Sequence, residues 1–134
     1  MIVKRGTTDS GARWQLSYGL NGGQHCLEMR VNGALFDDAC GFDIPGTTEV
    51  GFSGALKPGK GDYILYGVTS QRIVTVRAES AEGNSEVATE KLPEGTQSPL
   101  RFFVLTREPV DNVGALVALD ASRAVVQRIP LPRR

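Results

Sequence analysis

The residues best suited to chemistry gather in one stretch, QHCLEMRVNGALFDDACG, which spans residues 24–41. It holds both cysteines and the only histidine of the chain, on either side of an Asn-Gly pair. Cysteine and histidine serve as nucleophiles, bases and zinc ligands, and two cysteines can also close a disulfide. The stretch therefore raises three alternatives: a disulfide, a metal site or part of a catalytic site.

The register of a predicted hairpin, with Asn32-Gly33 at its turn, decides between these alternatives. Regular pairing around a two-residue loop puts Cys26 opposite Ala39, and the two sulfurs then lie on opposite faces. A three-residue loop, or one bulge within residues 36–38, puts Cys26 opposite Cys40 instead. We call this register even, because the numbers of opposed residues then have an even sum. It brings the two cysteines within the separation that a disulfide needs.

The even register also collects apolar side chains on one face of the hairpin. We expect this core face to contain Asp37 as its one polar misfit, and to consist otherwise of Leu27, Met29, Val31, Leu35 and Ala39. The cysteines would lie on the opposite, partly exposed face. We therefore predict a disulfide between Cys26 and Cys40, with two unlinked thiols as the alternative.

A disulfide closing a loop of about 15 residues would contribute ~3 kcal/mol to stability. It also implies an oxidising compartment outside the cytoplasm. A metal site is disfavoured because His25 and Cys26 are neighbours that project to opposite faces of a strand. The Cys-x-x-Cys spacing of structural zinc sites is also absent, so we expect no metal.

Other chemical motifs are incomplete. The segment 54–61 fits a phosphate-binding loop up to its last position, where Gly61 replaces the Ser or Thr that ligates magnesium. Ser53 lies between glycines, but its only available base is His25, and no helix is predicted after it. Asp37 and Asp38 are adjacent, so they point to opposite faces of a strand. We expect no catalytic residue and no cofactor.

Four aromatic residues are of the kind that stack on sugar rings: Trp14, Tyr18, Tyr63 and Tyr66. Trp14 shares its parity with Leu16, which favours a place in the core. Tyr63 and Tyr66 have opposite parity on one predicted strand, so at most one of them can join a binding platform.

Composition limits the classes of partner. The 134 residues include 15 basic and 15 acidic side chains, so no bulk charge attracts nucleic acid or an anionic membrane. The longest apolar runs are far shorter than the ~20 residues that span a bilayer, and we expect no membrane insertion. The opening MIVKRGTTDSG lacks the apolar stretch of a signal peptide.

Alternating hydrophobicity predicts an all-β fold. Turn signals recur about every ten residues, and only residues 120–127 offer a helical alternative to a hairpin loop. We predict a single-domain antiparallel β-sandwich over residues 1–134, immunoglobulin-like, with a jelly roll as the alternative and residues 130–134 as a free tail. The ten predicted strands cover residues 14–18, 24–31, 35–42, 49–52, 63–68, 73–78, 85–92, 100–105, 114–119 and 125–131.

A series of short motifs supports this fold. They are Gly11-x-x-Trp14-x-Leu16, Cys26-Leu27, Cys40-Gly41, Tyr66-Gly67-Val68 followed by Ile73-Val74-Thr75-Val76-Arg77, Arg101-Phe102-Phe103 and Ala118-Leu119-Asp120. Their order resembles that of small secreted or membrane-anchored immunoglobulin-like β-sandwich proteins of actinobacteria. The resemblance covers residues 11–128, implies an extracytoplasmic domain and carries over no catalytic residue.

We expect the chain to be a non-enzymatic, extracytoplasmic interaction or structural module. A carbohydrate-binding module is the first alternative, and an enzyme or enzyme subunit the second. A protein partner would dock at an exposed sheet edge, or at the predicted loops 57–62 and 107–112, because unpaired backbone groups and loops are where binding concentrates.

Overall fold

The computed structural model describes residues 1–8, 11–21, 24–40, 50–56, 64–80, 83–96, 99–106 and 113–130. They form three four-stranded antiparallel sheets. The strands are β1 (Ile2–Thr7), β2 (Arg13–Asn21), β3 (Gln24–Val31), β4 (Ala34–Cys40), β5 (Val50–Leu56), β6 (Ile64–Thr69), β7 (Thr75–Ser80), β8 (Gly83–Ala88), β9 (Glu90–Lys91), β10 (Arg101–Thr106), β11 (Val113–Leu119) and β12 (Val125–Pro130), with a 3₁₀ turn at Glu94–Thr96.

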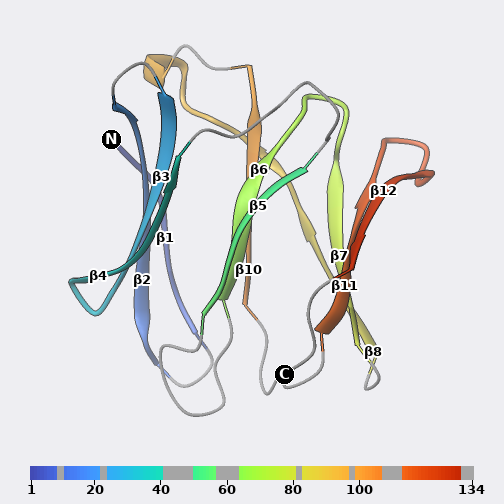
Figure 1. Cartoon of the computed structure of the whole chain (residues 1–134), viewed down its shortest axis with the longest axis horizontal. Coiled ribbons are helices and arrows are strands. Elements are labelled where there is room, and N and C mark those ends of the chain that lie inside the picture. Colours follow the sequence, from blue (N-terminus) through green and yellow to red (C-terminus); the bar gives the residue numbers. More distant parts are fainter. Residues whose placement is uncertain are drawn as a thin grey trace.

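The three sheets are stacked as layers (Figure 1). The N-terminal sheet has the order β1-β2-β3-β4, the middle sheet β5-β6-β10-β9, and the C-terminal sheet β12-β11-β7-β8. Two separate cores hold the layers together, one on each side of the middle sheet. The structure is thus an all-β antiparallel sandwich, but with three layers where an immunoglobulin-like sandwich has two.

The middle sheet is buried on both faces, which explains its sequence. In β6, Ile64, Tyr66 and Val68 join the core shared with the N-terminal sheet, whereas Leu65 faces the other core. In β10, Phe102 and Phe103 divide between the two cores in the same way. A strand that is covered on both faces has no polar side, so it reads as a continuous apolar run.

The first core takes one side chain in two from the strands of the N-terminal sheet. Its buried members from that sheet are Trp14, Leu16, Tyr18, Leu27, Met29 and Val31. At the side of the stack, Lys4 of the edge strand β1 forms an ion pair with Glu90 of the edge strand β9. The predicted core position of Trp14 is confirmed.

The β3–β4 hairpin has the even register at the cysteines. Asn32 and Gly33 both have positive φ, 50° and 84°, as a two-residue type I′ turn requires. The pairing then shifts by one residue between Arg30 and Met29, so that Phe36 forms a bulge and Met29 lies opposite Asp37. Cys26 consequently lies opposite Cys40, and a disulfide joins them.

The same bulge corrects one expectation. Leu35 lies on the turn side of the bulge and pairs with Arg30, so it points to the outer face and is 53% exposed. The core-face prediction for Leu35 is therefore wrong, because it assumed that one parity holds along the whole strand.

The chain passes from the C-terminal sheet to the middle sheet at Thr89, a buried residue between β8 and β9. Its hydroxyl donates to the carbonyl of Ile73 (2.7 Å) and accepts from Nε of Arg101 (2.7 Å). A further nitrogen of Arg101 donates to the Thr89 carbonyl (2.8 Å). These bonds satisfy the polar groups of the crossing, where no ladder is available to do so.

Residues 120–124 form the hairpin loop between β11 and β12, not a helix. The carboxylate of Asp120 accepts hydrogen bonds from the backbone of Ser122 and Ala124 and from the Ser122 hydroxyl. β12 ends at Pro130, and residues 131–134 of the predicted tail lie outside the described part. Within the described ranges, no helix has the length and apolar composition needed to cross a membrane.

Candidate functional site

His25 and the neighbouring carboxylates do not converge on a single point. The Tyr18 hydroxyl hydrogen bonds to Nδ1 of His25. Asp37 points inward as predicted, where the buried Tyr66 donates to its Oδ2 (2.6 Å), while Asp38 is exposed on the opposite face. Ser53 lies on β5, in a different sheet from His25.

The aromatic residues form no exposed platform in the described part. Trp14 is 7% exposed and Tyr66 is fully buried, and Tyr63 lies outside the described residues. The loop 57–62 lies outside them too, as does all of the loop 107–112. Among the residues that the structure describes, no group of three or more His, Cys, Asp or Glu is arranged to hold a metal ion.

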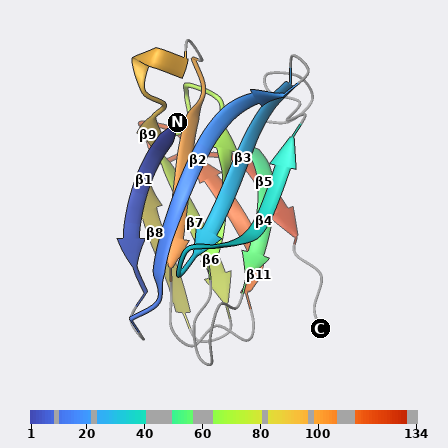
Figure 2. The same ribbon diagram turned by 90° about the vertical axis from the view of Figure 1, so that its left-hand side faces the viewer.

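Figure 2 views the N-terminal sheet from its outer side. The register of this sheet brings three arginines together on its outer face. Arg5 pairs with Gln15, which pairs with Arg30 on the next strand. In the adjacent row, Thr7 pairs with Arg13. Paired residues of neighbouring strands have Cβ atoms only about 5 Å apart, so these side chains share one patch of surface.

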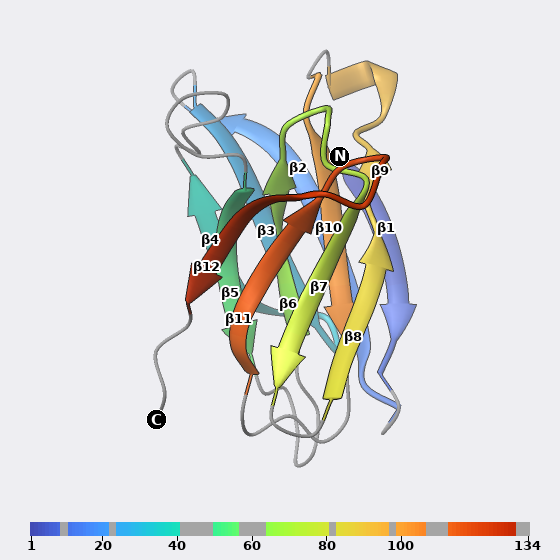
Figure 3. The same cartoon turned by 90° about the vertical axis from the view of Figure 1, so that its right-hand side faces the viewer.

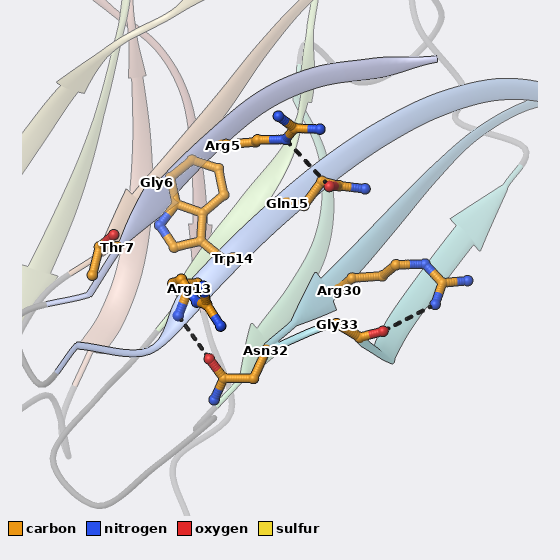
Figure 4. Close-up of a pocket in the computed structure, with 9 residues that line it drawn as sticks. All are labelled: Arg5, Gly6, Thr7, Arg13, Trp14, Gln15, Arg30, Asn32 and Gly33. Carbon is orange, nitrogen blue, oxygen red and sulfur yellow. Dashed lines mark hydrogen bonds between the residues drawn. The ribbon is translucent and has the colours of Figure 1, made fainter.

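This patch contains an open pocket of about 520 Å³, which we call the arginine pocket (Figure 4). Its lining residues are Arg5, Gly6, Thr7, Arg13, Trp14, Gln15, Arg30, Asn32 and Gly33. None of these described lining residues is acidic. The pocket therefore carries the charge of three guanidinium groups, because arginine stays protonated at any physiological pH.

Hydrogen bonds within the arginine pocket fix which atoms its amides present. Nε of Arg5 donates to Oε1 of Gln15 (3.3 Å), and the backbone N–H of Arg13 donates to Oδ1 of Asn32 (3.0 Å). Both amide oxygens are thus used inside the protein. The NH₂ groups of Gln15 and Asn32 remain as donors, so the side chains of the pocket offer mainly hydrogen-bond donors.

On the core side of the sheet beneath the pocket, the indole of Trp14 packs against a glycine. A Cβ atom at Gly6 would lie 2.3 Å from Cζ2 of the Trp14 indole, so only glycine leaves room for the ring. Within the described residues, Nε1 of Trp14 is buried and has no hydrogen-bond acceptor. Figure 4 shows this nitrogen on the side of the ring nearest Thr7.

On the opposite outer face of the molecule, each of three arginines has a glutamate partner. Figure 3 shows the strands of this C-terminal sheet. On the C-terminal sheet, Glu86 accepts from both Arg77 (2.9 Å) and Arg123 (2.7 Å), and Glu79 binds Arg128 (3.0 Å). Hydrogen bonds from the guanidinium groups of Arg123 and Arg77 hold the pKa of Glu86 below its usual value of 4.5, and the bond from Arg123 has the larger effect.

The arginine pocket lacks such compensation. Arg30 forms an ion pair with Glu28 (2.6 Å) and donates to the carbonyl of Gly33 (3.5 Å). Arg5 and Arg13 have no carboxylate partner among the described residues. These two arginines therefore differ from Arg77, Arg123 and Arg128, each of which contacts a glutamate.

The far end of the same outer face is acidic. There Ser17, Glu28 and Asp38 line a second pocket, of about 420 Å³, next to the Cys26–Cys40 disulfide. The outer face of the N-terminal sheet thus has a basic end at the Asn32-Gly33 turn and an acidic end at the disulfide.

The exposed edge β4 is the other surface that the sequence suggested for docking. Leu35 and Phe36 are exposed on it, at 53% and 40%. The Phe36 bulge and the charge of Asp38 interrupt the strand, and these are features that discourage the addition of a further strand. The arginine pocket is therefore a better candidate binding site than the β4 edge.

The arginine pocket was not found from the sequence. Strand parity alone places Arg13 and Gln15 on the outer face of the predicted strand 14–18, extended by one residue. Arg5 lies on β1, a strand that was not predicted from the sequence. Without β1, the lining residues Arg5, Gly6 and Thr7 cannot be assigned to the same face as Arg13.

Fold and surface together define an all-β protein of stacked antiparallel sheets, with a donor-rich cationic pocket on one outer sheet. Comparisons with protein-family models, with curated proteins and with solved structures each give no match. The resemblance to actinobacterial proteins therefore stays a prediction.

Proposed function

We propose that this chain is a non-enzymatic binding module of an oxidising, extracytoplasmic compartment, and that it binds its partner through the arginine pocket. The observation that carries this proposal is the difference between the two outer faces. Arg77, Arg123 and Arg128 of the C-terminal face each contact a glutamate, whereas Arg5 and Arg13 have no carboxylate partner among the described residues. Charged groups left uncompensated on a rigid sheet are suited to an external ligand of opposite charge.

The disulfide supports the location. A Cys26–Cys40 bond whose second cysteine is exposed at the surface would be reduced in the cytoplasm, whereas it persists in secreted and cell-surface proteins. We therefore place the module outside the cytoplasm, either secreted or at the cell surface.

The order of the strands supports an immunoglobulin-like assignment for residues 50–130. The middle sheet runs β5-β6-β10-β9 and the C-terminal sheet β12-β11-β7-β8. If β5 to β12 are lettered A, B, C, C′, D, E, F and G, these orders are ABED and GFCC′, as in immunoglobulin domains. In this proposal the N-terminal sheet is an added layer that covers the ABED face and presents the pocket.

A binding screen on arrays of glycans, peptides and small anions tests the proposal. The variant Arg5→Gln/Arg13→Gln removes two charges from the arginine pocket. The control Lys91→Gln/Arg123→Gln removes two exposed charges elsewhere and leaves Glu86 its bond to Arg77. We expect partner binding to be lost in the first variant and kept in the control. Equal binding by both variants, or no binding by the wild type, would contradict the proposal.

A further inference from the structure

We infer that the arginine pocket binds a small ligand carrying at least two negatively charged oxygen groups, such as phosphoryl or carboxylate groups. This inference rests on the proposed function and specifies the chemistry of its ligand. Oxyanions supply acceptors only, and the side chains of the pocket supply mainly donors.

The charges of the pocket point to more than one anionic group. Arg5 and Arg13 lie in adjacent rows of the outer face and have no carboxylate partner among the described residues. Arg30 shares its charge with Glu28, yet it still lines the pocket. A planar guanidinium binds a phosphoryl or carboxylate group through two parallel hydrogen bonds, so two uncompensated arginines fit two such groups.

The neutral residues that line the pocket also offer mainly hydrogen-bond donors. The amide oxygens of Gln15 and Asn32 are used inside the protein, and their NH₂ groups are left to donate. The acceptors that this pocket lacks are the atoms that an oxyanion carries.

The size of the pocket favours a small ligand over a polymer. Its volume of about 520 Å³ lies within the range of small-molecule sites, roughly 300–1,000 Å³. The net charge of the chain is zero, so no extended positive field is present to hold a nucleic acid backbone.

The test uses the fluorescence of Trp14, the only tryptophan of the chain, which lines the pocket. The full chain is titrated with pyrophosphate and, separately, with citrate, while sodium chloride keeps the ionic strength constant. We expect a saturable change in fluorescence with at least one probe. Saturation by pyrophosphate alone identifies a phosphoryl ligand, and saturation by citrate alone a carboxylate ligand.

Two variants locate the binding. Arg13→Gln removes a guanidinium that has no hydrogen-bond partner among the described residues, and we expect affinity to fall at least about tenfold. Gln15→Glu is nearly isosteric and places a carboxylate between Arg5 and Arg30, so it should abolish saturation. Lys91→Gln is the matched control and should bind as the wild type does. Urea unfolding of each variant shows that the fold is retained.

Two results would overturn the inference: no saturable change with either probe, or the same loss of affinity in Arg13→Gln and Lys91→Gln. The proposed function can fail separately. If array binding depends on Arg5 and Arg13 but neither probe saturates, only the oxyanion inference falls. If the probes saturate but array binding ignores these arginines, only the proposed function falls.

Discussion

At the scale of single residues, Gly6 and Trp14 pack closely together beneath the arginine pocket, on the core side of the N-terminal sheet. The indole occupies the space that a side chain at residue 6 would need, and the ring is fixed because it is buried in the first core. The glycine is therefore required by a close approach rather than by an unusual backbone angle.

Replacing Gly6 by alanine should destabilise the protein. The added methyl group would lie 2.3 Å from the indole, and moving a packed ring costs about 1–3 kcal/mol. We expect the urea midpoint of Gly6→Ala to fall accordingly. Gly19→Ala on β2 is the matched control, because nothing lies within 4 Å of its added Cβ atom. Equal midpoints for the two variants would show that the indole does not occupy this position.

Strand parity predicted some of these residue positions and missed others. It placed Trp14 in the core and Asp37 on the core face, both correctly. The reason why a carboxylate is tolerated there lies on a distant strand: the hydroxyl of Tyr66 donates to Asp37, and the two are 29 positions apart in the chain. A pattern within one strand contains no information about a partner in another sheet.

At the scale of elements, the β3–β4 hairpin shows how a turn and a bulge set a register together. Asn-Gly favours the two-residue turn, which by itself would keep the cysteines on opposite faces. The bulge at Phe36 restores the even register and moves Leu35 outward. The sequence left both routes to the even register open, because a bulge of this kind has no sharp sequence signature.

Removing the disulfide tests this hairpin. The bond joins residues 14 positions apart, and in the chain-entropy account a loop of this length contributes about 3 kcal/mol. We expect Cys26→Ser/Cys40→Ser to lose about that much stability in urea unfolding, and the wild type to show no reactive thiol when denatured without a reductant. Two reactive thiols in the wild type would contradict both the disulfide and the inferred compartment.

The sequence predicted most of the other strands, but it missed β1 and did not separate β8 from β9. Nine of the predicted strands overlap single observed strands, and the tenth, 85–92, covers both β8 and β9, which the sheet crossing at Thr89 separates. β1 was missed because its residues, Ile-Val-Lys-Arg-Gly-Thr, are short of apolar alternation; it is an edge strand with a bulge between Ile2 and Lys4.

At the scale of the whole molecule, the three layers leave two outer sheet faces, and these differ in how their arginines are paired. Salt bridges join the strands of the C-terminal sheet and the β11–β12 loop, where Arg123 reaches Glu86 of β8. The N-terminal sheet keeps its basic end uncompensated in the described part. The sequence predicted sheets and turns, but the number of layers depends on which faces pack together, and only the continuous apolar runs of β6 and β10 hinted at a covered middle sheet.

Acid should weaken the contacts of two carboxylates, Glu86 on the C-terminal sheet and Asp120 in its β11–β12 loop. The pKa of Glu86 lies below its usual 4.5 because of hydrogen bonds from Arg123 and Arg77, and the pKa of Asp120 lies below its usual 3.8 because of bonds from Ser122 and Ala124. A depressed pKa means that the ionised group stabilises the fold above the usual value, and that this contribution is lost as pH falls through and below it.

We therefore expect the thermal midpoint of the wild type to fall as the pH drops from about 5 to 3. Glu86→Gln/Asp120→Asn should have a lower midpoint at pH 7 and a flatter pH dependence, because two of the titrating groups are gone. Thermal scans followed by circular dichroism measure both. An unchanged slope in the double variant would rule out these two carboxylates as the cause.

The most direct test of the binding face is a two-dimensional ¹H–¹⁵N NMR titration of the full chain with pyrophosphate at constant ionic strength. We predict saturable shifts confined to the arginine pocket, in the amides of Thr7, Arg13 and Asn32 and in the single indole N–H resonance of Trp14. Shifts centred on Arg77 and Arg128 of the C-terminal sheet, or no saturable shift at all, would contradict the account.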